Sequence, residues 1–202
     1  MHLRRGDVVF TADSSGNGMH ALITLAQKVG GAFGEGHASS VHAAIATGNG
    51  SEVVESVGSG LRAQGLRHRN YRVYCYRGAQ EIEVQDAAAM IAESYVAQKD
   101  FTQGYGNYDK TKAAISPFRA AGGHMMVNAQ TCQFGDDAFV SNAFFCSNMV
   151  WRCYAAAAEV VGMAALPIPN SHGQLSPRDL EGLLIADRNW HARKSGRTIA
   201  YP

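Results

Sequence analysis

The sequence predicts an α+β domain built on a small antiparallel sheet. Three observations support this fold class: short β-branched segments gather in the first half of the chain, helical periodicities flank them, and a strong turn joins two of them. A chain of 202 residues with 46% hydrophobic residues is long enough to bury its own core. We therefore expect one domain over residues 1–202.

Four segments have the composition and spacing of β-strands: Val8–Thr11, Val41–Thr47, Glu52–Val57 and Tyr71–Tyr76. The second and third are separated by Gly48-Asn49-Gly50-Ser51, which is typical of a hairpin. Asn-Gly tolerates the positive φ angles of a type I′ turn, so we expect that turn type here.

Helical periodicity marks Met19–Val29, Val84–Gln98, Lys110–Ile115 and Phe144–Val161. Ser176 followed by Pro177 indicates the N-cap and first position of one more helix. The stretch from Gly122 to Asn142 has no clean period, so we expect a loop-rich insertion around 122–142. We expect little regular structure in the polar tail after Asp187.

The charge balance argues against several classes of function. With 18 Lys and Arg against 17 Asp and Glu, the chain has no general basic field to hold a nucleic acid. No run of eighteen apolar residues occurs, so we expect no transmembrane helix. The N-terminus lacks the apolar region and cleavage site of a signal peptide, which predicts synthesis in the cytoplasm without ordinary export.

The cysteines and histidines do not follow the spacing of a metal site. Four cysteines without a CxxC pair are too sparse for a disulfide scaffold or a zinc ribbon, and HExxH is absent. We therefore predict neither a metal nor an organic cofactor. Tyr105 and Tyr108 lie in a Gly-rich segment and are candidates to line a substrate groove, although aromatic loop residues also commonly cap a core.

Cys146 is the strongest candidate for a reactive side chain. It follows Phe144 and Phe145 and lies in the first turn of the predicted helix that ends at Val161. Unpaired backbone N–H groups and the helix dipole at that position stabilise a thiolate. The same N–H groups can hold the oxyanion formed when the thiolate attacks a carbonyl. The alternative is a buried structural cysteine, since free Cys is among the most buried residue types.

A thiol nucleophile needs a base, and His42 is the one histidine of eight inside a predicted strand. Strands hold catalytic groups more rigidly than loops do. By alternation His42 shares a strand face with Ala44 and Ala46, whose small side chains leave space for a partner. The alternative is a tolerated histidine on an exposed face.

A third group should orient the imidazole. If the hairpin loop has two residues, Ala44 pairs with Glu55. Glu55 then lies on the diagonal from His42, within reach of long side chains. A three-residue loop would turn the other face of the strand and replace Glu55 by Glu52. The Asn-Gly signal favours the two-residue loop and therefore Glu55.

Taken in order, these motifs resemble a known family. The chain is similar to the permuted NlpC-like papain-fold cysteine peptidases, in the branch that includes YiiX-type proteins, with the lecithin retinol acyltransferase family as a more distant relative. The order is informative because the histidine precedes the cysteine, opposite to papain. The motifs are Gly6-Asp7-Val8-Val9-Phe10, Ser40-Val41-His42-Ala43-Ala44-Ile45, Val53–Ser56, Tyr108-Asp109, Phe145–Trp151 and Ser176–Leu180.

The resemblance implies a circularly permuted papain-like fold, with the small antiparallel sheet or barrel packed against the nucleophile helix. It implies Cys146 as nucleophile, His42 as base and Glu55 as orienting acid, with no cofactor. The chain departs from the pattern at Asn148, where relatives often carry Glu, and in the segment 122–142. Both departures bear on the substrate.

The function expected from the resemblance is hydrolysis of an amide bond in bacterial cell-wall stem peptides. That substrate lies outside the cytoplasm, and no signal peptide is predicted. The expectation is therefore an antibacterial toxin delivered by a specialised secretion apparatus, with an immunity protein as a further partner.

Two alternatives stay open. The same triad serves acyl transfer or hydrolysis on lipids in the acyltransferase relatives. An apolar lid for such a substrate would draw on Phe134, Phe139, Phe144 and Phe145. The chain could also be a binding module that retains an unreactive triad.

Overall fold

The computed structural model describes residues 2–11, 40, 42–57, 60–66, 70–98, 146–168 and 175–197. The predicted helices Met19–Val29 and Lys110–Ile115 and the predicted insertion 122–142 lie outside these residues and stay predictions.

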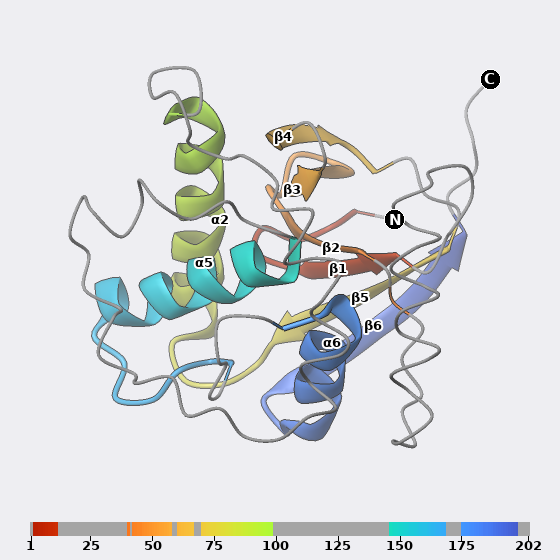
Figure 1. The fold of residues 1–202 in the computed structure, drawn as a ribbon. Helices are drawn as coiled ribbons and strands as arrows, with labels where there is room; N and C mark the ends of the chain where they lie inside the picture. The colour runs from red at the N-terminus through yellow and green to blue at the C-terminus, as the bar shows by residue number, and fades with distance from the viewer. Residues whose placement is uncertain are drawn as a thin grey trace.

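The described residues form an open six-stranded sheet and three helices (Figure 1). The strand order is β4-β3-β2-β1-β5-β6, and every neighbouring pair is antiparallel. This arrangement confirms the α+β class. The elements are β1 (Val8–Thr11), β2 (His42–Ala46), β3 (Glu52–Val57), β4 (Gly60–Gly65), β5 (Asn70–Tyr76), α2 (Glu81–Gln98), α5 (Cys146–Val161), α6 (Pro177–Ala186) and β6 (Trp190–Arg197).

The two faces of the sheet bury different sets of apolar side chains. Alternation in β2 sends Ala43 and Ile45 to the face covered by helices, where they join Met149 and Tyr154 of α5 in the main core. The other face carries a smaller buried cluster: Leu3, Val9, Ala44, Ala46, Val53, Leu66, Tyr71 and Val73. Because the two faces bury different side chains, a one-residue slip of β2 would send each set into the wrong cluster.

Helix α5 connects the main core to the sheet. It packs against α2 and against strands β2 and β3, and Figure 1 shows its N-terminal end beside the central strands. Helix α6 begins as expected at Ser176, whose hydroxyl accepts from the backbone of Asp179 in a capping box. Among the described residues, no helix has the length and apolar character needed to cross a bilayer.

The β2–β3 hairpin confirms the predicted register but not the predicted turn. Ala44 lies opposite Glu55, as expected. However, Asn49 keeps a negative φ, which excludes type I′, and its carbonyl accepts from the Glu52 backbone at 3.1 Å. The loop therefore has four residues, from Gly48 to Ser51. A four-residue loop preserves the faces of a two-residue loop, because the count is even in both.

The expectation of an unstructured tail after Asp187 was wrong, because β6 pairs with β5 along that stretch. Pairing with β5 satisfies backbone N–H and C=O groups of this polar strand. At a sheet edge, charged side chains also discourage pairing with other chains and so discourage aggregation. Trp190 anchors the strand through a tilted ring contact with Tyr76 and an edge-on contact with Tyr154, and its indole N–H donates to the Pro167 carbonyl at 2.6 Å. Strand β4 was not predicted either, since its sequence Gly-Leu-Arg-Ala-Gln-Gly lacks β-branched residues.

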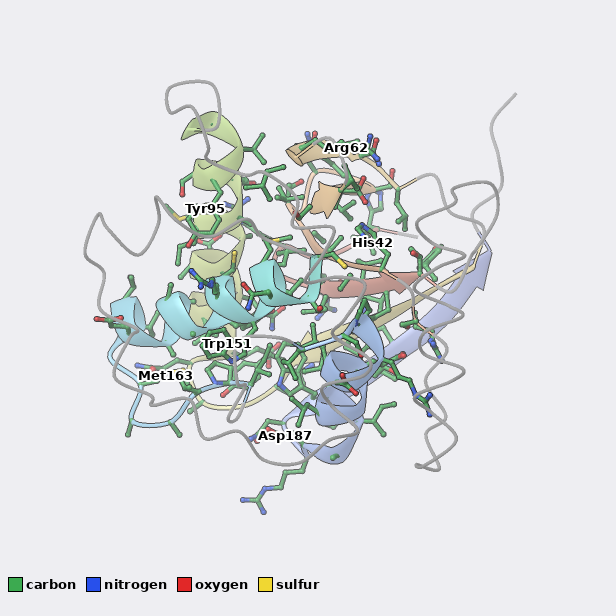
Figure 2. The ribbon with its side chains drawn as sticks, viewed as in Figure 1. His42, Arg62, Tyr95, Trp151, Met163 and Asp187 are labelled. Carbon is green, nitrogen blue, oxygen red and sulfur yellow. The ribbon has the colours of Figure 1, made fainter. Side chains whose placement is uncertain are left out.

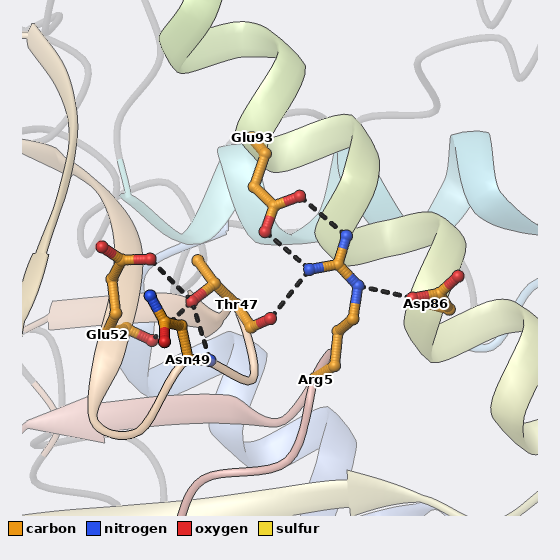
Figure 3. Close-up of polar contacts among 6 residues, drawn as sticks. All are labelled: Arg5, Thr47, Asn49, Glu52, Asp86 and Glu93. Atoms are coloured by element: carbon orange, nitrogen blue, oxygen red, sulfur yellow. Dashed lines mark hydrogen bonds and ion pairs between the residues drawn. The ribbon is translucent and has the colours of Figure 1, made fainter.

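Arg5 ties the N-terminal segment to the β2–β3 hairpin and to α2 (Figure 3). Its guanidinium makes two parallel contacts with Glu93, at 2.6 and 2.7 Å, and one with Asp86 at 2.5 Å. It also donates to the Thr47 carbonyl at 2.8 Å. These contacts hold the strand that carries His42 at a defined distance from the helical layer.

Gly6 is the tightest backbone contact between this segment and α2. It has φ of +81°, and a Cβ at this position would clash with the main chain of Gln85. Gly6→Ala is therefore expected to lower the free energy of unfolding by about 2 to 4 kcal/mol, measured by urea denaturation. Gly50→Ala is the matched control: its φ is +66° but the space around it is open, so it should cost only about 1 kcal/mol. Equal losses would contradict the role of the α2 contact.

Candidate functional site

The three predicted site residues come together in the structure. Cys146 is the first residue of α5, and His42 is the first residue of β2. Figure 2 shows His42 beside the N-terminal end of α5, and the two side chains are close enough to form a hydrogen bond. Cys146, His42 and Glu55 are all buried, with 1%, 4% and 2% of their surfaces exposed.

Glu55 lies on the diagonal from His42 across the β2–β3 ladder. Its Oε2 is 2.7 Å from Nε2 of His42, and both groups are removed from water. This contact leaves Nδ1 as the imidazole nitrogen available for Cys146. The order sulfur, imidazole and carboxylate is the arrangement in which a base is held in one orientation by a third group.

The second oxygen of Glu55 is held by two residues of β4. Arg62 Nε donates to Oε1 at 2.8 Å, and its Nη2 lies 2.7 Å from the same atom. The side-chain amide of Gln64 donates to Oε1 as well. These contacts restrict rotation of the carboxylate and keep Oε2 directed at His42.

The charge on His42 is set by its two neighbours. Burial by itself lowers the pKa of His42, but Cys146 and then Glu55 outweigh it and raise the pKa to about 10. Each neighbour contributes both a hydrogen bond and a negative charge. At neutral pH these two neighbours therefore favour the protonated imidazolium form of His42, next to the Glu55 carboxylate.

The pKa of Glu55 is shifted in the opposite direction to that of His42. Burial raises the pKa of Glu55, but His42 and then Arg62 lower it from 4.5 to about 2. A carboxyl with a depressed pKa in the folded state stabilises the fold above its unfolded pKa. That contribution is lost as the pH falls from 4.5 through about 2, because the unfolded chain then binds the proton more readily.

The stability of the wild type should therefore fall more steeply with acid than that of Glu55→Gln. We expect the difference in unfolding free energy between the two proteins to shrink progressively from pH 4.5 toward pH 2. Urea denaturation at half-unit pH steps measures this difference. A constant difference across that range would show that Glu55 is not held as a carboxylate by His42 and Arg62.

Glu52, the alternative to Glu55, has a different partner. Its carboxylate accepts from the Thr47 hydroxyl at 2.9 Å, at the end of the hairpin (Figure 3). Because Glu52 and Glu55 are three positions apart, an odd number, the two side chains leave β3 on opposite faces. The structure thus brings Glu55 to His42 and keeps Glu52 away from it. Tyr105 and Tyr108, the predicted substrate-binding residues, lie outside the described residues.

Sequence reasoning missed the contribution of β4 to the site. Arg62 and Gln64 alternate with Leu61 and Ala63, so a period of two was present to be found. The signal was weak because the segment is short and bounded by glycines. Without β4, the sequence predicts His42 as the partner of Glu55 and does not predict Arg62 or Gln64.

Cys153 and Asp7 have structural positions. Cys153 is fully buried in the core, seven residues after Cys146 on α5. Asp7 caps the turn before β1, accepting from the Arg4 backbone at 2.8 Å, and it also forms an ion pair with Arg193. Within the described part of the chain, no three His, Cys, Asp or Glu side chains gather as a metal site would require.

The helix start completes what the arrangement can do chemically. Ser147 donates to the Leu175 carbonyl, which fixes the first turn of α5 against the segment before α6. The first N–H groups of an α-helix have no intrahelical carbonyl to donate to, so a helix start such as that of α5 offers donors of the kind that hold a developing oxyanion. A nucleophile, a charged acid–base partner and an oxyanion site are the groups needed for acyl transfer.

No family model matches the chain, and no curated protein matches it. Among solved structures, the crystal structure of metalloprotein yiiX from Escherichia coli O157:H7 matches with a TM-score of 0.52 and 16% sequence identity. The match covers 98% of this chain and 99% of that one. The chain therefore shares an α+β fold with yiiX over nearly its whole length.

Proposed function

We propose that this protein is a cysteine hydrolase of the papain-like type that cleaves an amide bond. The observation that carries the proposal is the buried 2.7 Å contact between His42 and Glu55, next to Cys146 at the start of α5. A solvated surface histidine would need no such partner, and a structural cysteine would need no imidazole. The shared fold with yiiX is consistent with the permuted order in which the histidine precedes the cysteine.

In the proposed reaction, the Cys146 thiolate attacks the substrate carbonyl and forms a tetrahedral intermediate. The backbone N–H groups at the start of α5 stabilise its oxyanion. The intermediate collapses, the C–N bond breaks, and the His42 imidazolium gives its proton to the leaving amine. The neutral imidazole then takes a proton from water, which attacks the thioester and releases the acid and the thiolate.

Glu55 has a positioning role in this reaction. It holds the imidazole in one orientation through Nε2 and stabilises the positive charge that the ring carries before proton transfer. Arg62 and Gln64 keep Glu55 from turning away. No step of the proposed reaction uses a metal or an organic cofactor.

The proposed substrate is the stem peptide of the bacterial cell wall, cut between D-glutamate and the diamino acid. The support for this substrate is the family resemblance of the motifs around His42 and Cys146. Because the cell wall lies outside the cytoplasm, the proposal includes delivery by a specialised secretion apparatus into a rival cell. An immunity protein that protects the producer is part of the same proposal.

The test is digestion of purified peptidoglycan with wild type and Cys146→Ala, followed by mass spectrometry of the soluble fragments. We expect new amine termini at the stem-peptide bond with the wild type alone. Identical profiles would contradict the cell-wall substrate. Release of fatty acid from phospholipid vesicles by the wild type, again absent in Cys146→Ala, would identify a lipid acyl hydrolase in place of a peptidase.

The toxin proposal has its own test. The wild type fused to a periplasmic leader should lyse an Escherichia coli host, whereas the same protein without the leader should leave growth unchanged. Cys146→Ala with the leader is the matched control. Growth inhibition by the leaderless protein would contradict a target in the cell wall.

A further inference from the structure

A second buried carboxylate lies in the same region of the sheet. Glu181 of α6 is fully buried, and its charge is balanced by Arg72, whose Nε lies 2.9 Å from Oε1. The Tyr74 hydroxyl donates to Oε1 at 2.9 Å, and the Ser40 hydroxyl donates to Oε2 at 2.7 Å. The reaction proposed above does not use any of these four side chains.

Ser40 connects this cluster to His42. It lies two residues before His42, is fully buried, and also accepts from Nη2 of Arg72 at 3.0 Å. Glu181 and Arg72 belong to α6 and β5, so Ser40 is held by two other elements of the fold.

His42 needs such support because it lies at the end of its strand. It is opposite Thr11, the last residue of β1, and the β2–β3 ladder begins only at Ala44. Residues at strand ends have few ladder hydrogen bonds to restrain them and open most easily. The Glu55 contact orients the imidazole ring, and contacts on Ser40 add restraint to the backbone from which the ring projects.

We propose that Glu181 and Ser40 are positioning residues that hold His42 in line with Cys146 and Glu55 through the segment before β2. The inference rests on the proposed function. It also accounts for a costly feature, since a carboxylate taken out of water is stabilised only by well-placed partners. In this arrangement, α6 stabilises the fold and also sets the geometry of the His42 base.

The test uses Ser40→Ala and Glu181→Gln, with Tyr74→Phe as the matched control. Ser40→Ala removes the link to the His42 segment, whereas Glu181→Gln keeps the shape of the side chain and removes its charge. Tyr74→Phe removes a hydrogen bond to the same carboxylate but leaves the Ser40 contact in place. Circular dichroism and urea denaturation report the stability of each variant.

The readout is the rate of iodoacetamide alkylation at Cys146, followed by peptide mass spectrometry. The rate at pH 7 is divided by the plateau rate at high pH, where every thiol is ionised. This ratio cancels differences in access to the sulfur and reports the fraction of thiolate that the imidazolium maintains. A loss of stability alone does not change it.

We expect Ser40→Ala and Glu181→Gln to lower the ratio about three- to tenfold, the effect of losing one buried hydrogen bond. Tyr74→Phe should leave the ratio unchanged while lowering stability. If Glu181→Gln does not fold, the ratio measured for Ser40→Ala tests the positioning role by itself. Unchanged ratios in both variants, or an equal loss in Tyr74→Phe, would overturn the positioning role and leave the hydrolase proposal intact. A wild-type ratio no higher than that of free cysteine would overturn both.

Discussion

Cys146→Ala should lower kcat/KM for amide hydrolysis by roughly 10⁵- to 10⁶-fold, leaving only what binding and the oxyanion site contribute. The reason is that alanine removes the atom that forms the bond to the substrate carbonyl, and no other described cysteine lies beside His42. Cys75 and Cys153 are both buried away from the helix start. Steady-state kinetics on the peptide substrate identified by mass spectrometry measures the effect.

Cys153→Ala is the matched control for this prediction. The same substitution on the same helix removes a buried sulfur from the core, at a cost of roughly 1 kcal/mol in stability. Activity should stay within about twofold of the wild type, since an effect through stability alone leaves folded enzyme intact. Equal losses in the two variants would show that the effect at Cys146 is structural.

Glu55→Gln should lower kcat about 10³- to 10⁴-fold with little change in KM. The glutamine amide fits the same space but no longer stabilises a positive imidazole, so the pKa of His42 falls toward its ordinary value. The thiolate at Cys146 then loses its partner at neutral pH. The ratio of alkylation rates at pH 7 and at high pH should fall together with kcat.

Glu52→Gln is the control that separates the two candidate acids. It makes the same chemical change three residues away on the same strand, where the partner is the Thr47 hydroxyl. We expect activity within about twofold of the wild type. A larger loss in Glu52→Gln than in Glu55→Gln would assign the orienting role to Glu52 and contradict the observed register of the hairpin.

The central strands and the long helices could be predicted from local pattern. Strands β1, β2 and β3 match their predicted ranges within one or two residues, because valine, isoleucine and threonine favour strands and alternation fixes which side chains each face buries. The start of α6 was predicted from Ser176 and Pro177, since capping depends only on neighbours in sequence. The candidate site depended on the parity of one hairpin loop, which the register confirms even though the turn type was wrong.

The edge strands could not be found in the same way. Strand β4 has no β-branched residue, and β6 reads as a polar tail. Both form because a neighbouring strand offers unpaired backbone groups, which is a property of the assembled sheet. Arg62 and Gln64, which hold the Glu55 carboxylate, are on β4. Their contacts with Glu55 could therefore not be predicted from local sequence.

Strand alternation and helix caps could thus be predicted from the sequence alone, because they depend on interactions between residues a few positions apart. They were enough to nominate Cys146, His42 and Glu55 and to place the last two on one face. Contacts between residues 32 to 141 positions apart, such as those among Ser40, Arg72 and Glu181, followed only from folding. Their partners are chosen by the packing of α6 and β5 against the sheet, and the free energy that selects this packing is spread over the whole core.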